Sequence, residues 1–310
     1  MNVKIQVGFI TLKSLIKGVN YGKNEKTKVL LLKIGYKESR GNNMKNELAL
    51  VSTYWASVSG GKDSLYMLNL ILHNLDKYPL TGVAHFELEI DYPFIKNVID
   101  YMEHECVMHG IKFIRIKPDK TWIELYNTVN SKTGNIYGFP TRKARWCNDK
   151  YKLSAKKKLE QYMKSLGNSV TWYIGYCVDE TTRYNDRKNT NERYPLVENN
   201  IVEDDILQWA RKQEIFNNYY LTNKRCGCMY CPMSSYLNLA YLYKYYPKNF
   251  EYMIDKMKET EILREKELGR PFSVKSSNSK YNAYYVENIV KTKWFDKLNN
   301  MERDILQKKR

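Results

Sequence analysis

The sequence lacks any long apolar run. None of its 310 residues lie in a stretch approaching the roughly 18 to 20 apolar residues that cross a bilayer. It also lacks a secretory signal, because the apolar run from Val7 to Ile16 is broken by Lys13 and leads to no small-residue cleavage site. We therefore expect no membrane partner and a cytoplasmic location. The six cysteines are then metal ligands or reactive thiols rather than disulfides.

Acidic residues are few relative to basic ones. The 34 Asp and Glu face 51 Lys and Arg, a formal net charge of +17. Residues 1–43 hold nine Lys or Arg and two Glu, a net +7, and the remaining +10 is spread over the rest. Such a balance makes nucleic acid a candidate partner, with a merely solvated lysine-rich surface as the alternative. We treat residues 1–43 as a basic leader. It is an extra pair of strands, a basic tail, or a stretch that precedes the true start of the protein.

From Leu48 onward, apolar strand patterns alternate with helical ones. Segments rich in β-branched and aromatic residues predict strands at Thr53–Val58, Leu80–Leu88, Ile111–Ile116 and Val170–Tyr176. Helical spacing fills the gaps between them, and Gly110 and Gly167 are typical helix stops. Strands separated by helices of this length pair in parallel. The pattern predicts an α/β fold: a doubly wound, mostly parallel, Rossmann-like sheet over residues 44–222, and a helical, cysteine-containing region over residues 223–310.

A glycine-containing loop follows the first predicted strand. It reads Ser59, Gly60, Gly61, Lys62, Asp63 and Ser64. The glycines let backbone N–H groups approach an anion, and the helix that follows adds its own free N–H groups. Lys62 supplies a charge for phosphate oxygens, the two serine hydroxyls complete the cradle, and Asp63 either caps the helix or helps to hold Mg²⁺. We predict that this loop binds the phosphates of a nucleotide.

Further motifs follow the loop in chain order. They are His85 to Glu89 with Tyr92-Pro93, Gly138-Phe139-Pro140 with Arg145-Trp146-Cys147 and Lys152, Gly175 to Glu180 with Arg183, and Tyr194-Pro195-Leu196. With the loop, they resemble the PP-loop (N-type) ATP pyrophosphatases of the adenine nucleotide alpha hydrolase-like superfamily, and within it the phosphoadenosine phosphosulfate reductase family. The resemblance covers residues 50–232 and implies adenine lying over the strand ends. Glu87 stands where that family usually has an Asp, so the resemblance makes it a candidate for contact with the nucleotide or its metal.

Besides Lys62 of the loop, which would neutralise phosphate charge during catalysis, three charged residues are candidates for catalytic roles. Arg183 and Arg145 suit clamps on the charge that develops on a transferring phosphate. Glu180 suits the positioning of a hydroxyl or of an arginine. For each of them the alternative is an ordinary surface salt bridge.

Three thiols lie within six residues, at Cys226, Cys228 and Cys231. A Cys-x-x-Cys turn lets two sulfurs converge on one metal. The family resemblance implies Cys147 as the fourth ligand, at the same edge of the sheet. We expect a [4Fe–4S] cluster ahead of Zn²⁺, with redox-active thiols and buried structural cysteines as alternatives. The other two cysteines, at positions 106 and 177, read as core residues.

These motifs lead to three hypotheses on function. The first is an enzyme that cleaves ATP to AMP and pyrophosphate and adenylates a substrate for sulfur or nitrogen transfer. The second is a sulfonucleotide reductase that releases sulfite, although no cysteine follows Cys231 to serve as the C-terminal nucleophile of such enzymes. The third is a non-catalytic nucleotide-sensing or nucleic-acid-binding module. The intact phosphate loop favours an enzyme.

Overall fold

A computed structural model of the chain describes residues 6–7, 10–11, 51–131, 133–185 and 191–308. The predicted basic leader, residues 1–43, lies outside the described residues except for two short strands. These are β1 (Gln6–Val7) and β2 (Ile10–Thr11), which pair antiparallel with each other. In the part of the chain that is described, no helix is long and apolar enough to cross a membrane.

The described strands form one sheet in the order β2-β1-β5-β4-β3-β6-β7. The remaining strands are β3 (Val51–Val58), β4 (Gly82–Phe86), β5 (Lys112–Ile116), β6 (Asn168–Tyr173) and β7 (Glu192–Arg193). All neighbours from β5 to β7 pair in parallel, and β1 adds to the β5 edge in the antiparallel sense. The chain runs outward from β3 through β4 to β5 and then returns to place β6 on the other side of β3. The carboxyl end of β3 is thus the point where the winding reverses, the usual ligand position in such sheets.

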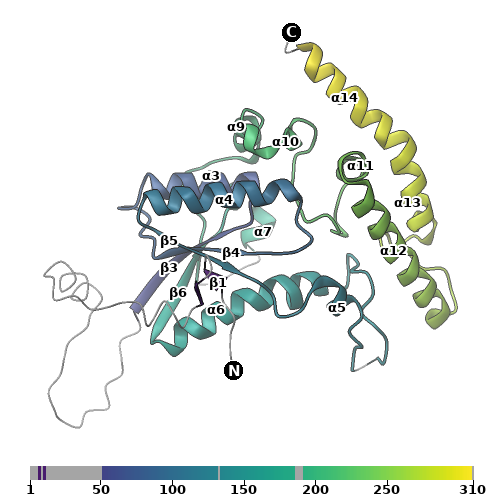
Figure 1. The fold of residues 1–310 in the computed structure, drawn as a ribbon, viewed down its shortest axis with the longest axis horizontal. Helices are drawn as coiled ribbons and strands as arrows, with labels where there is room; N and C mark the ends of the chain where they lie inside the picture. The colour runs from purple at the N-terminus through teal and green to yellow at the C-terminus, as the bar shows by residue number, and fades with distance from the viewer. Residues whose placement is uncertain (1–5, 8–9, 12–50, 132, 186–190, 309–310) are drawn as a thin grey trace, which may run out of the picture.

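Helices cover both faces of this sheet (Figure 1). On one face lie α3 (Lys62–Leu72) and α4 (Pro93–Met108), whose apolar sides join the larger core cluster. On the other face α6 (Leu153–Ser165) packs Ala155, Leu159 and Met163 against strand residues in a second cluster. The predicted doubly wound, mostly parallel α/β fold is therefore confirmed.

Shorter helices connect the sheet to the C-terminal region. They are α5 (Trp122–Tyr126), the π-helical η1 (Cys147–Lys152), α7 (Thr181–Asn185), α8 (Pro195–Glu198), α9 (Glu203–Ala210), the 3₁₀ turn η2 (Glu214–Phe216) and α10 (Tyr219–Thr222). The C-terminal region holds α11 (Tyr236–Tyr245), α12 (Pro247–Leu268), the 3₁₀ turn η3 (Ser279–Tyr281), α13 (Ala283–Ile289), the π-helical η4 (Val290–Trp294) and α14 (Phe295–Lys308). These last helices stand beside the sheet in Figure 1, yet their apolar side chains belong to the same core cluster as α3 and α4. The division at residue 222 stays a prediction.

The predicted elements are close to the observed ones. The strand expected over residues 80–88 is shorter and ends at Phe86, and α4 ends at Met108, two residues before the predicted stop at Gly110. Gly110 and Gly167 follow their helices with φ of +67° and +76°, values in the left-handed region that glycine adopts without strain. Cys106 and Cys177 are fully buried, as expected for core residues.

Candidate active site at the carboxyl end of the sheet

The loop between β3 and α3 is a preformed turn. Gly60 has a φ of +74°, and a Cβ added there would lie 2.6 Å from Cγ2 of Ile95 on α4. The Ser59 N–H donates to Oγ of Ser64 over 3.2 Å, and that hydroxyl donates to the Gly61 carbonyl over 2.9 Å. The backbone of the loop therefore approaches α4 more closely than any side chain at position 60 allows.

The chain that follows β6 lies against the start of α3. A Cβ added at Gly175 would lie 3.0 Å from the carbonyl oxygen of Asp63. Glu180 is buried, accepts from the Cys177 N–H over 3.2 Å, and its other oxygen accepts from Arg183 over 2.5 Å. The structure thus brings Glu180 and Arg183 together beside the phosphate loop, and their catalytic roles stay a prediction.

Lys62 is buried within a group of charged side chains. Its side chain is 1% exposed, and its ammonium lies 2.6 Å from Oδ1 of Asp63 and 3.3 Å from Oε1 of Glu203. Arg225 completes the group, with Nη2 2.7 Å from Glu203 and 3.2 Å from Glu180. Because a buried ammonium is unfavourable without counter-charges, the two carboxylates hold Lys62 away from the cavity walls. Its contact with phosphate stays a prediction.

The carboxylates around Lys62 differ in their acidity. Burial raises the pKa of Asp63 above its ordinary value, although the neighbouring Lys62 opposes the shift. Burial also acts on Glu203, but hydrogen bonds and charge from Arg225 and Lys62 outweigh it and hold its pKa below the ordinary value. The network therefore has one firmly ionised carboxylate, Glu203, and one, Asp63, that binds a proton or a cation more readily.

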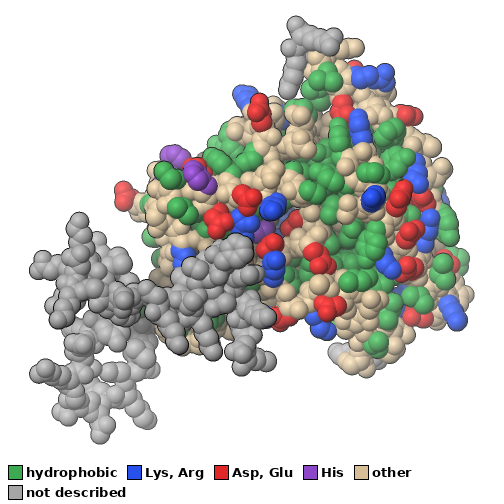
Figure 2. All heavy atoms as spheres, in the orientation of Figure 1, with side chains coloured by type: hydrophobic (Ala, Val, Ile, Leu, Met, Phe, Trp, Pro, Cys, Tyr) green, Lys and Arg blue, Asp and Glu red, His purple; other side chains and the backbone are tan. Residues whose placement is uncertain are grey.

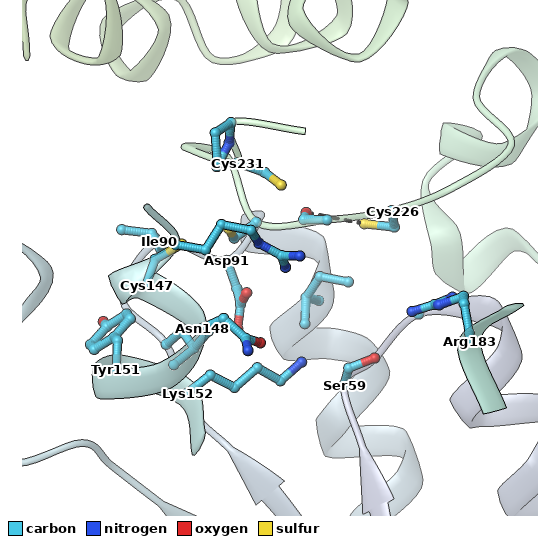
Figure 3. A pocket seen from close by; sticks show the side chains of 17 residues that line it. Ser59, Ile90, Asp91, Cys147, Asn148, Tyr151, Lys152, Arg183, Cys226 and Cys231 are labelled. Atoms are coloured by element: carbon cyan, nitrogen blue, oxygen red, sulfur yellow. Dashed lines mark hydrogen bonds between the residues drawn. The ribbon is translucent and has the colours of Figure 1, made fainter. Parts of the chain in front are cut away.

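Two adjoining cavities open beside the loop. One has a volume of about 280 Å³ and the other of about 640 Å³. Their shared walls include Ser59 and Gly61 of the loop and the cationic residues Arg145, Lys152 and Arg183. Figure 3 shows Lys152 and Arg183 reaching toward the loop from opposite sides. Arg145 and Arg183, both predicted site residues, therefore face the space in front of the phosphate loop.

The π-helical turn η1 presents several of these groups. It carries Cys147, Asn148, Tyr151 and Lys152, all of which line the smaller cavity. A π turn holds one residue more than an α-helical turn, and such turns are frequent at functional sites. Asn148 was not predicted, since nothing in its residue type distinguishes it from other polar helix residues.

All four predicted cysteine ligands line the smaller cavity, together with the phosphate loop. Cys147 comes from η1, and the other three come from the loop before α11 (Figure 3). In the described part of the chain, no three His, Cys, Asp or Glu side chains are so close that they would hold a metal ion as placed. The structure thus brings the four thiols to one cavity, and the metal stays a prediction.

The thiols differ in acidity. A hydrogen bond from the Cys228 thiol lowers the pKa of Cys231 to about 6 in spite of burial, and Lys275 and Arg145 contribute to the shift. Burial raises the pKa of Cys147 to about 11, and the charge of Cys231 adds to that shift. Among these four thiols, Cys231 is the one whose pKa lies below its ordinary value.

Glu87 does not reach the site. It follows the end of β4 and faces Lys117, with 3.7 Å between Oε1 and Nζ, and it lines neither cavity. The expectation that Glu87 contacts the nucleotide or its metal is therefore not supported by its position. Asp91 lines the smaller cavity instead, and burial raises its pKa to about 7. Its place directly before Tyr92 and Pro93, within a motif already recognised, was the signal that could have identified it.

Comparisons with known proteins place few constraints on the chain. No protein-family model matches it. Over 217 residues it is 27% identical to an uncharacterized protein of Methanocaldococcus jannaschii, a stretch that covers 67% of this chain and 40% of that protein. The chain therefore spans less than half the length of that curated relative.

Among solved structures, the chain is similar to the U34-tRNA thiolase NcsA from Methanococcus maripaludis, determined with its [4Fe–4S] cluster. The TM-score is 0.34 and the identity 16%, over 74% of this chain and 75% of that one. A likeness at this level does not carry an activity from one protein to another. Membership of the phosphoadenosine phosphosulfate reductase family therefore stays a prediction.

Proposed function

We propose that the chain is an enzyme that cleaves ATP between its α- and β-phosphates and adenylates an acceptor, which then receives sulfur or nitrogen. The observation that carries this proposal is the single cavity that both the phosphate loop and the four thiols line. A nucleotide held at the loop and a sulfur-handling group held by the thiols would therefore share one reaction space. Such proximity is the main contribution that a protein makes to a two-substrate reaction.

The polyphosphate would lie between the loop and three cationic side chains. Arg145, Lys152 and Arg183 line both cavities, and Arg183 keeps its guanidinium half-exposed while Glu180 orients it. Preorganised positive charge of this kind stabilises the charge that develops on a phosphate during displacement. Asp63, which lines the larger cavity, is the carboxylate placed to hold an accompanying Mg²⁺.

In the proposed reaction, an acceptor oxygen attacks the α-phosphorus and the bond from that phosphorus to the bridging oxygen breaks. Pyrophosphate leaves with the bonding electron pair. A sulfur or nitrogen nucleophile then displaces AMP, which carries away the acceptor oxygen. The chain contributes orientation and charge neutralisation, and Lys62 serves by keeping Asp63 and Glu203 in place.

The cysteine group fits an iron–sulfur cluster by its donor chemistry. Four thiols at one cavity match the Cys₄ set that such clusters and structural Zn²⁺ sites use. Cys147, Cys226, Cys228 and Cys231 would hold the cluster, and when bound it would supply an iron site for sulfide. The low pKa of Cys231 favours metal binding, because the thiolate is the form that coordinates.

One observation favours a second candidate, sulfonucleotide reduction. The Cys231 N–H donates to the Cys228 carbonyl over 3.2 Å in a tight turn, and both thiols line the smaller cavity, an arrangement that suits a redox pair. Cys231 would attack the sulfur of the sulfonucleotide and displace the nucleotide phosphate. Cys228 would then attack Cys231 and release sulfite, leaving a disulfide that an external dithiol reduces.

The deciding experiment incubates anaerobically purified protein with ATP and Mg²⁺, and separately with a sulfonucleotide and a dithiol. Formation of AMP and pyrophosphate supports the proposal, and sulfite supports the second candidate. Neither product, from protein that binds ATP, contradicts both.

A matched pair of variants links turnover to the cavity. Lys152→Ala removes a cation from the shared wall, whereas Lys157→Ala removes an exposed one from α6 outside both cavities. Loss of one charge-assisted phosphate contact should lower kcat/KM for ATP by roughly ten- to a hundredfold, and the Lys157 variant should match the wild type. Equal turnover of both variants would remove Lys152 from the proposed site.

A further inference from the structure

We refer to the two adjoining cavities beside the phosphate loop together as the first cavity. A second cavity lies apart from that loop. Its volume is about 670 Å³, within the range of small-molecule sites. Three segments form it: the loop over residues 137–144, the second half of α12, and the loop over residues 270–279. No Asp or Glu lines it, whereas five cationic residues do, namely Arg142, Lys143, Arg264, Arg270 and Lys275.

One wall of this cavity is fixed against α12. Gly138 has a φ of +63°, and a Cβ there would lie 2.9 Å from Cγ2 of Thr260. The Phe139 N–H donates to Oγ1 of Thr260 over 2.7 Å, and Arg264 donates to the Ile136 carbonyl over 2.7 Å. The loop that carries Arg142 and Lys143 is therefore anchored at its base.

The opposite wall is fixed by acidic residues of α12 that point away from the cavity. Buried Glu261 accepts from the Val274 N–H over 3.0 Å and from the Ala283 N–H over 2.8 Å. Glu265 accepts from the Phe272 N–H over 3.0 Å. These two carboxylates accept backbone hydrogen bonds and form no ion pair with the cations that line the cavity.

The positive charge of the cavity is only partly compensated. Arg264 is paired with Glu267 over 2.6 Å, and Lys275 donates to the carbonyl oxygens of Pro232 and Ser234. Among the described residues, no carboxylate forms an ion pair with Arg142, Lys143 or Arg270. On the face drawn in Figure 2, by contrast, basic and acidic side chains intermingle.

The second cavity adjoins the proposed active site. The loop over residues 141–145 places Arg142 and Lys143 at the second cavity and Arg145 at the first. A narrow space lined by Cys231 and Lys275 shares residues with both cavities. That space measures only about 10 Å³, so the two cavities are neighbours that a packed wall separates.

We propose that the second cavity binds the phosphate group of the acceptor substrate, an organic phosphate of nucleotide size that is distinct from ATP. Unpaired guanidinium groups recognise phosphate through paired N–H donors, and the ring of Phe272 in the wall suits stacking of a base. This inference rests on the proposed function, since it names the substrate that ATP activates. The phosphate belongs either to a free nucleotide or to the backbone of a single strand.

The test measures equilibrium binding of two probes to the full chain with the first cavity saturated by ATP. The probes are cytidine monophosphate, which avoids competition for an adenine site, and a single-stranded oligonucleotide of about ten nucleotides. The variants are Arg142→Ala combined with Arg270→Ala, and Lys143→Glu alone as a second route should the double variant not fold. Lys96→Ala combined with Lys248→Ala is the matched control, because it removes the same charge from exposed positions elsewhere. Circular dichroism checks each fold.

We expect the double variant to weaken probe binding by roughly ten- to a hundredfold, the Lys143 variant to weaken it in the same direction, and the control to bind as the wild type does. Weakened binding of the mononucleotide supports a free nucleotide, and weakened binding of the oligonucleotide alone supports a strand. Binding of neither probe, or equal binding by all variants, overturns the inference. ATP turnover by the wild type without any probe tests the proposed function separately, so the two failures are distinguishable.

Discussion

Replacement of Lys62 by methionine removes the ammonium of a buried ion network while keeping a side chain of similar length. The Lys62 side chain is 1% exposed, and its partners Asp63 and Glu203 are 32% and 20% exposed. Removal of one partner from a fully buried pair destabilises a protein by roughly 3 to 5 kcal/mol, because the remaining charge is left unpaired. The partial exposure of both carboxylates reduces this, so we expect the free energy of unfolding at pH 7 to fall by about 2 to 3 kcal/mol.

The loss should depend on pH in a defined direction. Burial already holds the pKa of Asp63 above its ordinary value of 3.8, and Lys62 opposes that shift. Without Lys62 the pKa rises further, so the folded variant binds a proton more tightly than its unfolded chain does. The stability of the variant is then highest in acid and declines as pH rises through the folded pKa. Its deficit relative to the wild type should therefore shrink as the pH is lowered from 7 toward 5.

Denaturant unfolding of both proteins at pH 7 and pH 5 measures this difference. Lys96→Met, on the exposed side of α4, is the control and should change stability by less than about 0.5 kcal/mol. A Lys62→Met protein as stable as the wild type, or a deficit equal at both pH values, would refute the reasoning. ATP turnover by the Lys62→Met variant, measured under conditions in which it is folded, then tests the predicted contact of Lys62 with phosphate. A loss of turnover under those conditions cannot come from unfolding.

Two further predictions concern the loop and the thiols. Gly60 and Gly134 both have φ above +70°, a conformation in which alanine is unfavourable by about 1 to 2 kcal/mol. Only at Gly60 would the added Cβ also clash with a neighbour, Ile95, at 2.6 Å. The Gly60 variant should therefore lose more stability and ATP affinity, and equal losses would argue against a close approach of the loop to α4. The Cys147→Ser variant, purified anaerobically, should lose most of the iron or zinc that the wild type binds. The Cys106→Ser variant, a substitution in the core, should keep it. An unchanged metal content in Cys147→Ser would show that Cys147 is not a ligand.

The sheet and its phosphate loop could be predicted because their signals are local. The strand before the loop shows as a run of apolar and aromatic residues, and α4 begins at Pro93 and is followed by Gly110, both of which are visible in the sequence. Ordered motifs then placed Arg145 and Arg183 at one edge of the sheet, since the carboxyl ends of parallel strands share that edge.

What sequence reasoning missed depends on partners distant along the chain. The ammonium of Lys62 is held by Glu203, 141 residues further on, and no spacing rule connects them. Glu87 and Asp91 are four residues apart, and which of them faces the cavity depends on where β4 ends and how the chain turns toward α4. The second cavity could likewise not be predicted, because its cations come from α12 and from two loops that are distant from each other along the chain.

The π-helical turn at residues 147–152 carries residues that line the cavity and leads into residues that pack against the sheet. In one continuous α-helix the orientations of these two groups would be fixed relative to each other. Ala155, Leu159 and Met163 face the sheet, while Cys147 and Asn148 face the cavity. Successive residues of an α-helix are rotated by about 100° around its axis. Deletion of one residue within the turn would therefore rotate the Cys147 thiol and the Asn148 amide by that angle, while Ala155, Leu159 and Met163 keep their packing against the sheet. Insertions and deletions of single residues at this turn are therefore a route by which the chemistry of the cavity can change without any repacking of the core.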